Sequence, residues 1–248
     1  MMKNRVTLLN GKFDPFTLSQ TTDAIFKDIA EGKRGWLCTV NVAILMMMRG
    51  DAKLQKFVDN ALIIVADGQP LVWIAPWLDK PLPERVTGVD LVESICERAV
   101  VEKKGIYLLG ATSNIVEILA NRLRNKFPGL QVDYADGYFS SNDAATRADK
   151  VKQSGASILL VGMGVPRQEL FIEEHWERLG VGMAIGVGGS FDVLAGLRRR
   201  APSWVQSLGL EWTYRMLQEP RRLFMRYLVT NLQFIRCLFA ELVQPKSN

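Results

Sequence analysis

Short apolar runs alternate with longer amphipathic segments along most of this chain of 248 residues, and this alternation limits the fold more than any other feature. Seven runs have the length and apolar character of buried strands: Arg5–Leu9, Trp36–Val40, Ala61–Ala66, Ile106–Leu109, Val132–Tyr134, Ser157–Val161 and Met183–Val187. Segments between them have helical periodicity, for example Thr21–Ala30, Gly88–Glu102 and Thr112–Lys126. This pattern is typical of α/β proteins. We predict a Rossmann-like parallel sheet with helices on both faces.

Composition and cysteine usage indicate a folded protein of a reducing compartment. Hydrophobic residues make up 48% of the chain and charged residues 23%, values that exclude a disordered chain. The cysteines, Cys38, Cys96 and Cys237, are far apart and odd in number, so they predict neither disulfides nor a zinc site. The amino end lacks a secretory signal pattern, and Trp36–Met48 and Phe224–Val243 are too short or too charged to span a bilayer. We expect a cytoplasmic protein.

The chain changes character at 198–202, where three arginines precede Ala-Pro. Residues 198–248 contain nine Lys and Arg against three Glu, and they hold no strand-like run. Helices are predicted at Trp204–Met216 and Pro220–Val243. We therefore divide the chain into an α/β catalytic domain, 1–197, and a basic helical membrane-associating appendage, 198–248.

The arginines of the appendage support this membrane role. In the second predicted helix, arginine and Phe or Leu occupy different stripes, as in helices that lie on membranes. Anionic lipid attracts each such cation by about 1 kcal/mol. The cations in question are Arg215, Arg221, Arg222 and Arg226. A solvated face of a helix packed on the domain is the alternative.

Glycine and polar residues follow the predicted strands, where open α/β sheets bind ligands and helix N-termini attract anions. They are Thr39, Asn41, Asp67, Gly68, Gly110, Gly162, Gly164, Gly188 and Gly189. Glycine lets a backbone approach phosphate closely. The G-x-G-x-x-G and P-loop signatures are absent from the sequence, which disfavours a dehydrogenase or a P-loop enzyme. The sequence has one histidine and no D-x-D spacing, so we predict neither a metal site nor a cofactor.

Two pairs of residues beyond these loops have chemistry suited to a sugar nucleotide. Arg85, close before a Thr87-Gly helix start, could neutralise a diphosphate, whereas the alternative is an exposed Arg beside an ordinary cap. Gln168 and Glu169 open a helix and could bind sugar hydroxyls or a uracil edge. The alternative is that Glu169 only interacts favourably with the helix dipole in the first turn.

Asp67 could act as a general base or as an Asp-Gly turn residue.

Seven stretches, spread in order along nearly the whole chain, form a recognisable set: Ala66–Gly68, Pro83–Leu91, Gly162–Glu169, Gly186–Asp192, Arg200–Trp204, Glu211–Trp212 and Glu219–Leu223. Together they resemble the WecG/TagA/CpsF family of bacterial glycosyltransferases, glycosyltransferase family 26. The resemblance implies an inverting enzyme that transfers a hexose from a UDP-sugar to a polyprenyl-diphosphate-linked sugar in envelope polysaccharide synthesis, at the inner face of the membrane. Because D-x-D is absent, we predict that this reaction is metal-independent. The transferred sugar is implied to be N-acetylmannosamine, N-acetylmannosaminuronic acid or glucose.

The resemblance also implies roles for individual residues. Asp67 is the implied general base, and Arg85 the contact to the diphosphate. Thr39 and Asn41 line a sugar pocket, Gln168 lies beside the donor sugar, and Gly188 and Gly189 approach the nucleotide. Arg215 and Arg222 stabilise the departing UDP. The competing hypothesis is a noncatalytic nucleotide- or membrane-binding module; we expect no nucleic acid partner, and homo-oligomer formation stays open.

Overall fold

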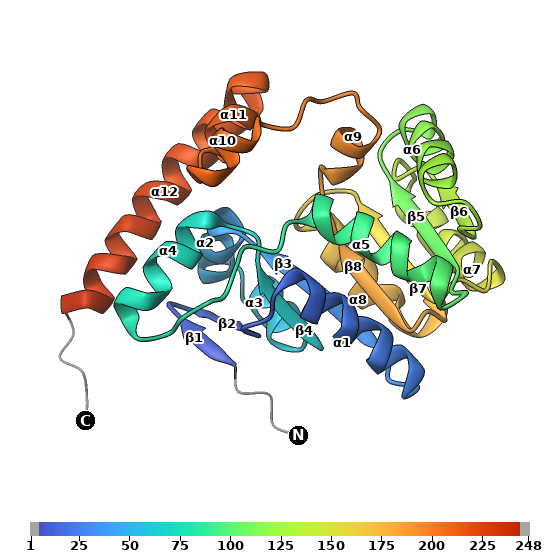
Figure 1. The fold of residues 1–248 in the computed structure, drawn as a ribbon, viewed down its shortest axis with the longest axis horizontal. Coiled ribbons are helices and arrows are strands. Elements are labelled where there is room, and N and C mark those ends of the chain that lie inside the picture. The colour runs from blue at the N-terminus through green and yellow to red at the C-terminus, as the bar shows by residue number, and fades with distance from the viewer. Residues whose placement is uncertain (1–4, 244–248) are drawn as a thin grey trace.

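The computed structural model describes residues 5–243, and they contain a six-stranded parallel sheet of order β4-β3-β8-β7-β5-β6 (Figure 1). Its strands are β3 (Gly35–Val40), β4 (Ile63–Ala66), β5 (Ile106–Gly110), β6 (Val132–Ala135), β7 (Ile158–Gly162) and β8 (Met183–Gly186). All six coincide with predicted runs. The α/β prediction is confirmed.

Buried side chains on both faces explain why these runs are apolar without alternation. Successive strand residues point to opposite faces, and the core is accordingly divided into two clusters. Ile64 and Leu159 belong to one, whereas Ile63 and Leu160 belong to the other. Each fully buried Ile or Leu contributes about 1.5–3 kcal/mol. The four central strands therefore have no exposed polar side chain in their middle, whereas the edge strand β6 carries the exposed Asp133.

Helices cover each face, as predicted. One face carries α2 (Val42–Gly50), α3 (Ala52–Asp59), α4 (Gln69–Ile74), α7 (Ala144–Gln153) and α8 (Arg167–Leu179). The other carries α1 (Leu18–Ala30), α5 (Gly88–Val101), α6 (Ser113–Lys126) and α9 (Ser190–Leu194). Single 3-10 turns follow α4 at Ala75–Leu78 (η1) and precede α7 at Ser141–Asp143 (η2).

The first predicted run forms a strand outside the parallel sheet. β1 (Val6–Leu8) pairs antiparallel with β2 (Gly11–Phe13), an element that the sequence analysis missed. Its expected place in the parallel sheet is wrong, because a two-residue connection can join only antiparallel neighbours. The hairpin leads to Asp14, which exchanges two hydrogen bonds with the backbone of Ile64, of 2.7 and 2.8 Å. This contact covers the outer edge of β4.

The appendage consists of α10 (Ser203–Ser207), α11 (Glu211–Gln218) and α12 (Pro220–Val243). The predicted helix Pro220–Val243 is confirmed. The single helix predicted at Trp204–Met216 is wrong, because Gly209, at φ +62°, separates α10 from α11. α12 packs on α2, and its far end is tied to the domain by a Lys80–Glu241 ion pair of 2.9 Å (Figure 1). None of the described helices is long and apolar enough to cross a membrane. The boundary at 197/198 stays a prediction.

Candidate active site

Two cavities meet at the carboxyl end of the sheet. The strand-end cavity, of about 340 Å³, lies over β3, β7 and β8, and the glycine-rich loops that follow β7 and β8 line it. The appendage cavity, of about 410 Å³, lies between the β4–α4 loop, the start of α5, and helices α11 and α12. The residues that line both cavities are Asn41, Asp67, Ser190, Arg215 and Tyr227. Asp67 therefore stands where the two spaces join.

Asp67 is held at this junction by its position after β4. Its backbone N–H donates to the carbonyl of Val40, 2.9 Å away on the neighbouring strand, so the sheet ladder ends at this residue. Burial raises the pKa of Asp67 to about 7, against an opposing effect of Arg85. Arg215 also lowers this pKa, whereas Glu211 and Asp90 raise it. A carboxyl with this pKa exchanges protons near neutral pH.

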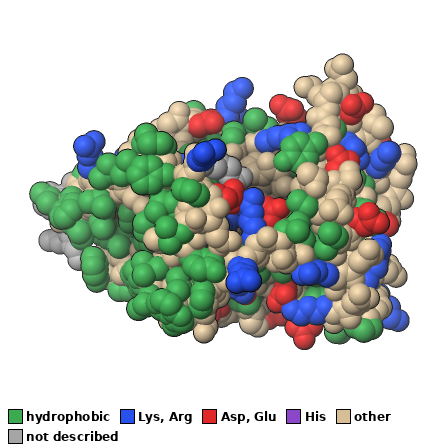
Figure 2. Space-filling model, turned by 90° about the horizontal axis from the view of Figure 1, so that it is seen from above, with side chains coloured by type: hydrophobic (Ala, Val, Ile, Leu, Met, Phe, Trp, Pro, Cys, Tyr) green, Lys and Arg blue, Asp and Glu red, His purple; other side chains and the backbone are tan. Residues whose placement is uncertain are grey.

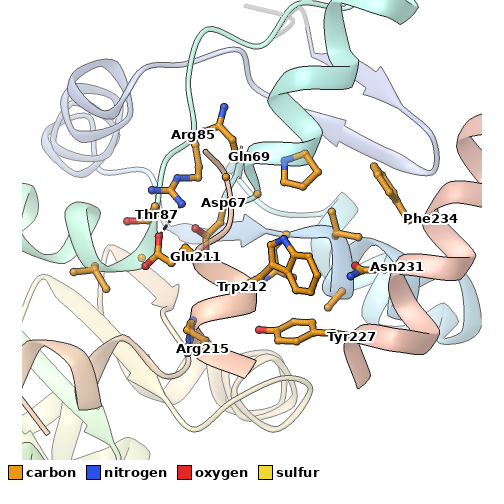
Figure 3. A pocket seen from close by; sticks show the side chains of 18 of the residues that line it. Asp67, Gln69, Arg85, Thr87, Glu211, Trp212, Arg215, Tyr227, Asn231 and Phe234 are labelled. Carbon is orange, nitrogen blue, oxygen red and sulfur yellow. Dashed lines mark hydrogen bonds and ion pairs between the residues drawn. The ribbon is translucent and has the colours of Figure 1, made fainter. Parts of the chain in front are cut away.

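Arg85 forms an ion pair with the appendage. Its Nη1 donates to Glu211 Oε2 over 2.7 Å, and both side chains face the appendage cavity beside Asp67 (Figure 3). The loop that carries Arg85 is fixed because Val86 N–H donates to Ala66 O, 2.8 Å away. The sequence analysis predicted Arg85 at this site without its partner.

Thr87 caps the N-terminus of α5, and its partner Asp90 links this helix to the appendage. Its hydroxyl accepts from Asp90 N–H and donates to the carboxylate of Asp90, at 3.2 and 2.7 Å. Arg200 holds the same carboxylate with two hydrogen bonds of 2.6 Å. Burial alone raises the pKa of Asp90, but the hydrogen bonds from Arg200 and Thr87 and the nearby arginine charges lower it below its ordinary value. This ion pair attaches the start of the appendage to the domain.

The structure brings most of the predicted site residues together. Thr39, Gly162, Gly164, Gln168, Gly188 and Gly189 line the strand-end cavity, and Gly68, Arg85 and Thr87 line the appendage cavity. Gly110 does not line either cavity: a Cβ there would lie 2.5 Å from Gly162 O, so this glycine lets β5 and β7 approach. Glu169 lies buried behind Gln168 and away from both cavities. The side chain of Arg222 lies outside the part of the chain that the structure describes.

Several lining residues come from the appendage and were not selected as site residues from the sequence. Trp212 and Tyr227 pack edge to face at 5.7 Å between ring centres, and both line the appendage cavity (Figure 3). Tyr227, Asn231 and Phe234 follow one another at the spacing of one helix face. That spacing was legible in the sequence, but nothing there showed which face of α12 would meet the cavity.

Metal-ligating residues do not gather at this site. No group of three or more His, Cys, Asp or Glu side chains that could hold an ion occurs within residues 5–243. The charged groups that face the cavities are instead carboxylates and arginines, among them the ion pairs Arg85–Glu211 and Arg198–Asp192.

The chain as a whole also matches a known family. The family model of the glycosyl transferase WecG/TagA/CpsF family matches residues 6–248. The chain belongs to the WecG/TagA/CpsF family of glycosyltransferases. The family assignment expected from the sequence motifs is thus confirmed.

Curated relatives support the same family membership. An N-acetylglucosaminyldiphosphoundecaprenol N-acetyl-β-D-mannosaminyltransferase of Bacillus spizizenii is 33% identical over 193 residues, which are 77% of this chain and 74% of the relative. A protein of the same name from Staphylococcus aureus is 30% identical over 221 residues, 88% of this chain and 87% of the relative.

Proposed function

We propose that this WecG/TagA/CpsF protein transfers N-acetylmannosamine from UDP-N-acetylmannosamine to an N-acetylglucosamine that is linked to polyprenyl diphosphate. The transfer inverts the configuration at the anomeric carbon. The names of its curated relatives support this transferred sugar and this acceptor. The transfer would serve envelope polysaccharide synthesis. The proposal narrows the donors implied by the sequence motifs to one.

The observation that carries the proposal is the position of Asp67 between two cavities. We assign the nucleotide to the strand-end cavity, because its glycine loops follow β7 and β8 and lead into helices, a position at which phosphate binds in α/β sheets. We assign the lipid-linked sugar to the appendage cavity, whose walls include Trp212, Phe234 and Ile235. Asp67 then faces both the attacking hydroxyl and the anomeric carbon.

A single displacement follows from this arrangement. Asp67 accepts the proton of the acceptor hydroxyl, and that oxygen bonds to the anomeric carbon while the bond from this carbon to the diphosphate oxygen breaks. The electron pair leaves with UDP. Attack from the face opposite the leaving group inverts the configuration.

Arginine is proposed to stabilise the departing diphosphate. A Cβ at Gly189 would lie 2.7 Å from Nη2 of Arg215, so this guanidinium rests directly over the glycine loop of the strand-end cavity. A cation in this position, together with loop N–H groups, offsets the charge that develops on UDP. We therefore expect turnover in the presence of a chelator.

The exposed face of α12 supports an anionic membrane surface as partner. Its exposed apolar side chains lie within an arc of about 140° at 100° per residue. They are Phe224, Met225, Leu228, Val229, Leu232, Ile235, Phe239, Leu242 and Val243, called here the apolar stripe. Hydrophobic side chains gather at the end of the molecule where α12 lies, on the left of Figure 2. Arg221 and Arg236 are exposed on the same helix, as anionic lipid favours.

The decisive experiment measures sugar transfer from radiolabelled UDP-sugars to polyprenyl-diphosphate-N-acetylglucosamine in chelator. Donors are UDP-N-acetylmannosamine, its uronic acid and UDP-glucose. We expect lipid-linked product from the first donor, with Asp67→Asn slower by about 10²–10⁴-fold. Product formed only with added divalent cation would contradict metal independence. Equal rates in wild type and Asp67→Asn would remove Asp67 as the base.

A further inference from the structure

One side chain, Gln168, joins the two glycine loops of the strand-end cavity. Its Oε1 accepts hydrogen bonds from the backbone N–H groups of Gly164 and Gly188, each 3.1 Å away. Gly164 follows β7 and Gly188 follows β8, and both line the cavity. A single amide oxygen thus bridges the two loops beyond the end of the β7–β8 ladder.

The orientation of this amide depends on Glu169. Gln168 Nε2 donates to Glu169 Oε1 over 2.8 Å. A carboxamide has almost the same shape when flipped, but a flipped Gln168 would turn its NH₂ group toward two N–H donors and lose both loop contacts. Burial raises the pKa of Glu169, and the hydrogen bond from Gln168 lowers it. Because Glu169 Oε1 accepts from the Gln168 NH₂ group, the contact favours the orientation in which Gln168 Oε1 faces the loops.

The surroundings of the pair are closely packed. Gln168 is 2% exposed and Glu169 is 8% exposed. A Cβ at Gly186 would lie 2.4 Å from Gln168 Nε2, so the glycine that ends β8 makes room for the amide. Within residues 5–243, the second oxygen of Glu169 has no hydrogen-bond partner. Burying a carboxyl group in this way costs stability, and its one side-chain hydrogen bond is to Gln168.

We propose that Glu169 is a positioning residue which, through Gln168, holds the two glycine loops in the geometry that binds the nucleotide diphosphate. The inference rests on the proposed function, because that function places UDP in the strand-end cavity. It assigns Glu169 no contact with substrate. Glu169→Leu should therefore raise the KM for the UDP-sugar and leave the KM for the lipid acceptor unchanged.

The test is titration calorimetry of UDP with the full chain. Glu169→Leu should weaken UDP binding about tenfold, as expected for losing one buried hydrogen bond. Glu169→Gln retains an oxygen that accepts from Gln168, so its affinity should stay within about twofold of the wild type. The double variant Gln168→Ala/Glu169→Leu should bind UDP no more weakly than Gln168→Ala alone. Glu173→Leu, an exposed change on the same helix, is the matched control.

A charge swap keeps the inference testable if Glu169→Leu does not fold. Gln168→Glu places two carboxyls side by side and should weaken UDP binding. Adding Glu169→Gln restores a donor opposite the new acceptor and should recover the affinity. If the swap does not recover UDP binding, or if the losses in Gln168→Ala/Glu169→Leu are additive, the positioning role of Glu169 is overturned. The proposed function is not affected by either result. A folded wild type that binds no UDP would overturn the proposed function and this inference together.

Discussion

Arg85 and Glu211, which are 126 positions apart in the chain, form a 2.7 Å ion pair at the wall of the appendage cavity, beside the carboxyl of Asp67. Glu211 raises the pKa of Asp67 by its negative charge. We predict that Glu211→Gln lowers this pKa, because the repulsion of the ionised carboxylate is removed.

The pH dependence of kcat measures this effect. A base works only when ionised, so the wild-type rate should fall as the pH drops through about 7, the pKa of Asp67. In Glu211→Gln the same fall should occur at lower pH. Glu173→Gln removes an exposed charge from another helix and should leave the profile in place. A profile of Glu211→Gln that matches the wild type would contradict the predicted coupling.

Asp67→Asn should become more stable relative to the wild type as the pH rises. The folded-state pKa of about 7 lies above the unfolded value of about 3.9, so the ionised carboxylate disfavours folding. This destabilisation is absent below about pH 4, grows up to about pH 7 and is complete above it, with about 4 kcal/mol as an upper bound. Urea denaturation at pH 4.5 and pH 8 tests it. The prediction fails if the difference between the two proteins is the same at both pH values.

Phe239→Glu should weaken binding to anionic vesicles without destabilising the fold. Phe239 is 64% exposed within the apolar stripe, so it contributes little to the core. A carboxylate there opposes both apolar insertion and attraction to acidic lipid. Gln233→Glu adds the same charge to an exposed position of α12 outside the stripe, and it serves as the control. Equal vesicle sedimentation of the two variants would argue against the stripe as the lipid contact.

Gly110→Ala should destabilise the protein by about 1–3 kcal/mol. The backbone there has φ +154°, and a Cβ would lie 2.5 Å from Gly162 O. Gly50→Ala is the matched control, because a Cβ at Gly50 meets no atom within 4 Å and the residue lies in α2. That change should be neutral or stabilising. Thermal unfolding of both variants gives the comparison, and a Gly110→Ala protein as stable as the wild type would show that the strands can separate without cost.

The sheet could be predicted from sequence because strands buried on both faces are apolar without interruption. Arg5–Leu9 has the same appearance, and only its short connection to Gly11–Phe13 makes it a hairpin. Asp67 was predictable for a related reason, since a polar residue after such a run must lie at the edge of the sheet. The local sequence pattern is therefore sufficient to predict a feature that depends on one strand alone.

Contacts between distant segments could not be predicted in this way. The pairing of Arg85 with Glu211 depends on where the appendage docks, and docking is a property of the assembled surfaces. Gln168 and Glu169 looked equivalent as neighbours in a first helical turn. Side chains one residue apart on a helix differ by about 100° in direction, and only Gln168 faces the cavity.

The two apolar faces of α12 also have a consequence for the protein in solution. Leu223 and Phe234 are buried on one face, whereas the apolar stripe meets water whenever no lipid is present. Exposed patches of this kind promote association between copies of a protein. Without vesicles or detergent, the apparent mass should therefore rise with protein concentration, and a mild detergent that covers the apolar stripe should reverse the rise. Self-association and membrane attachment would then exclude each other, because both would use the apolar stripe of α12.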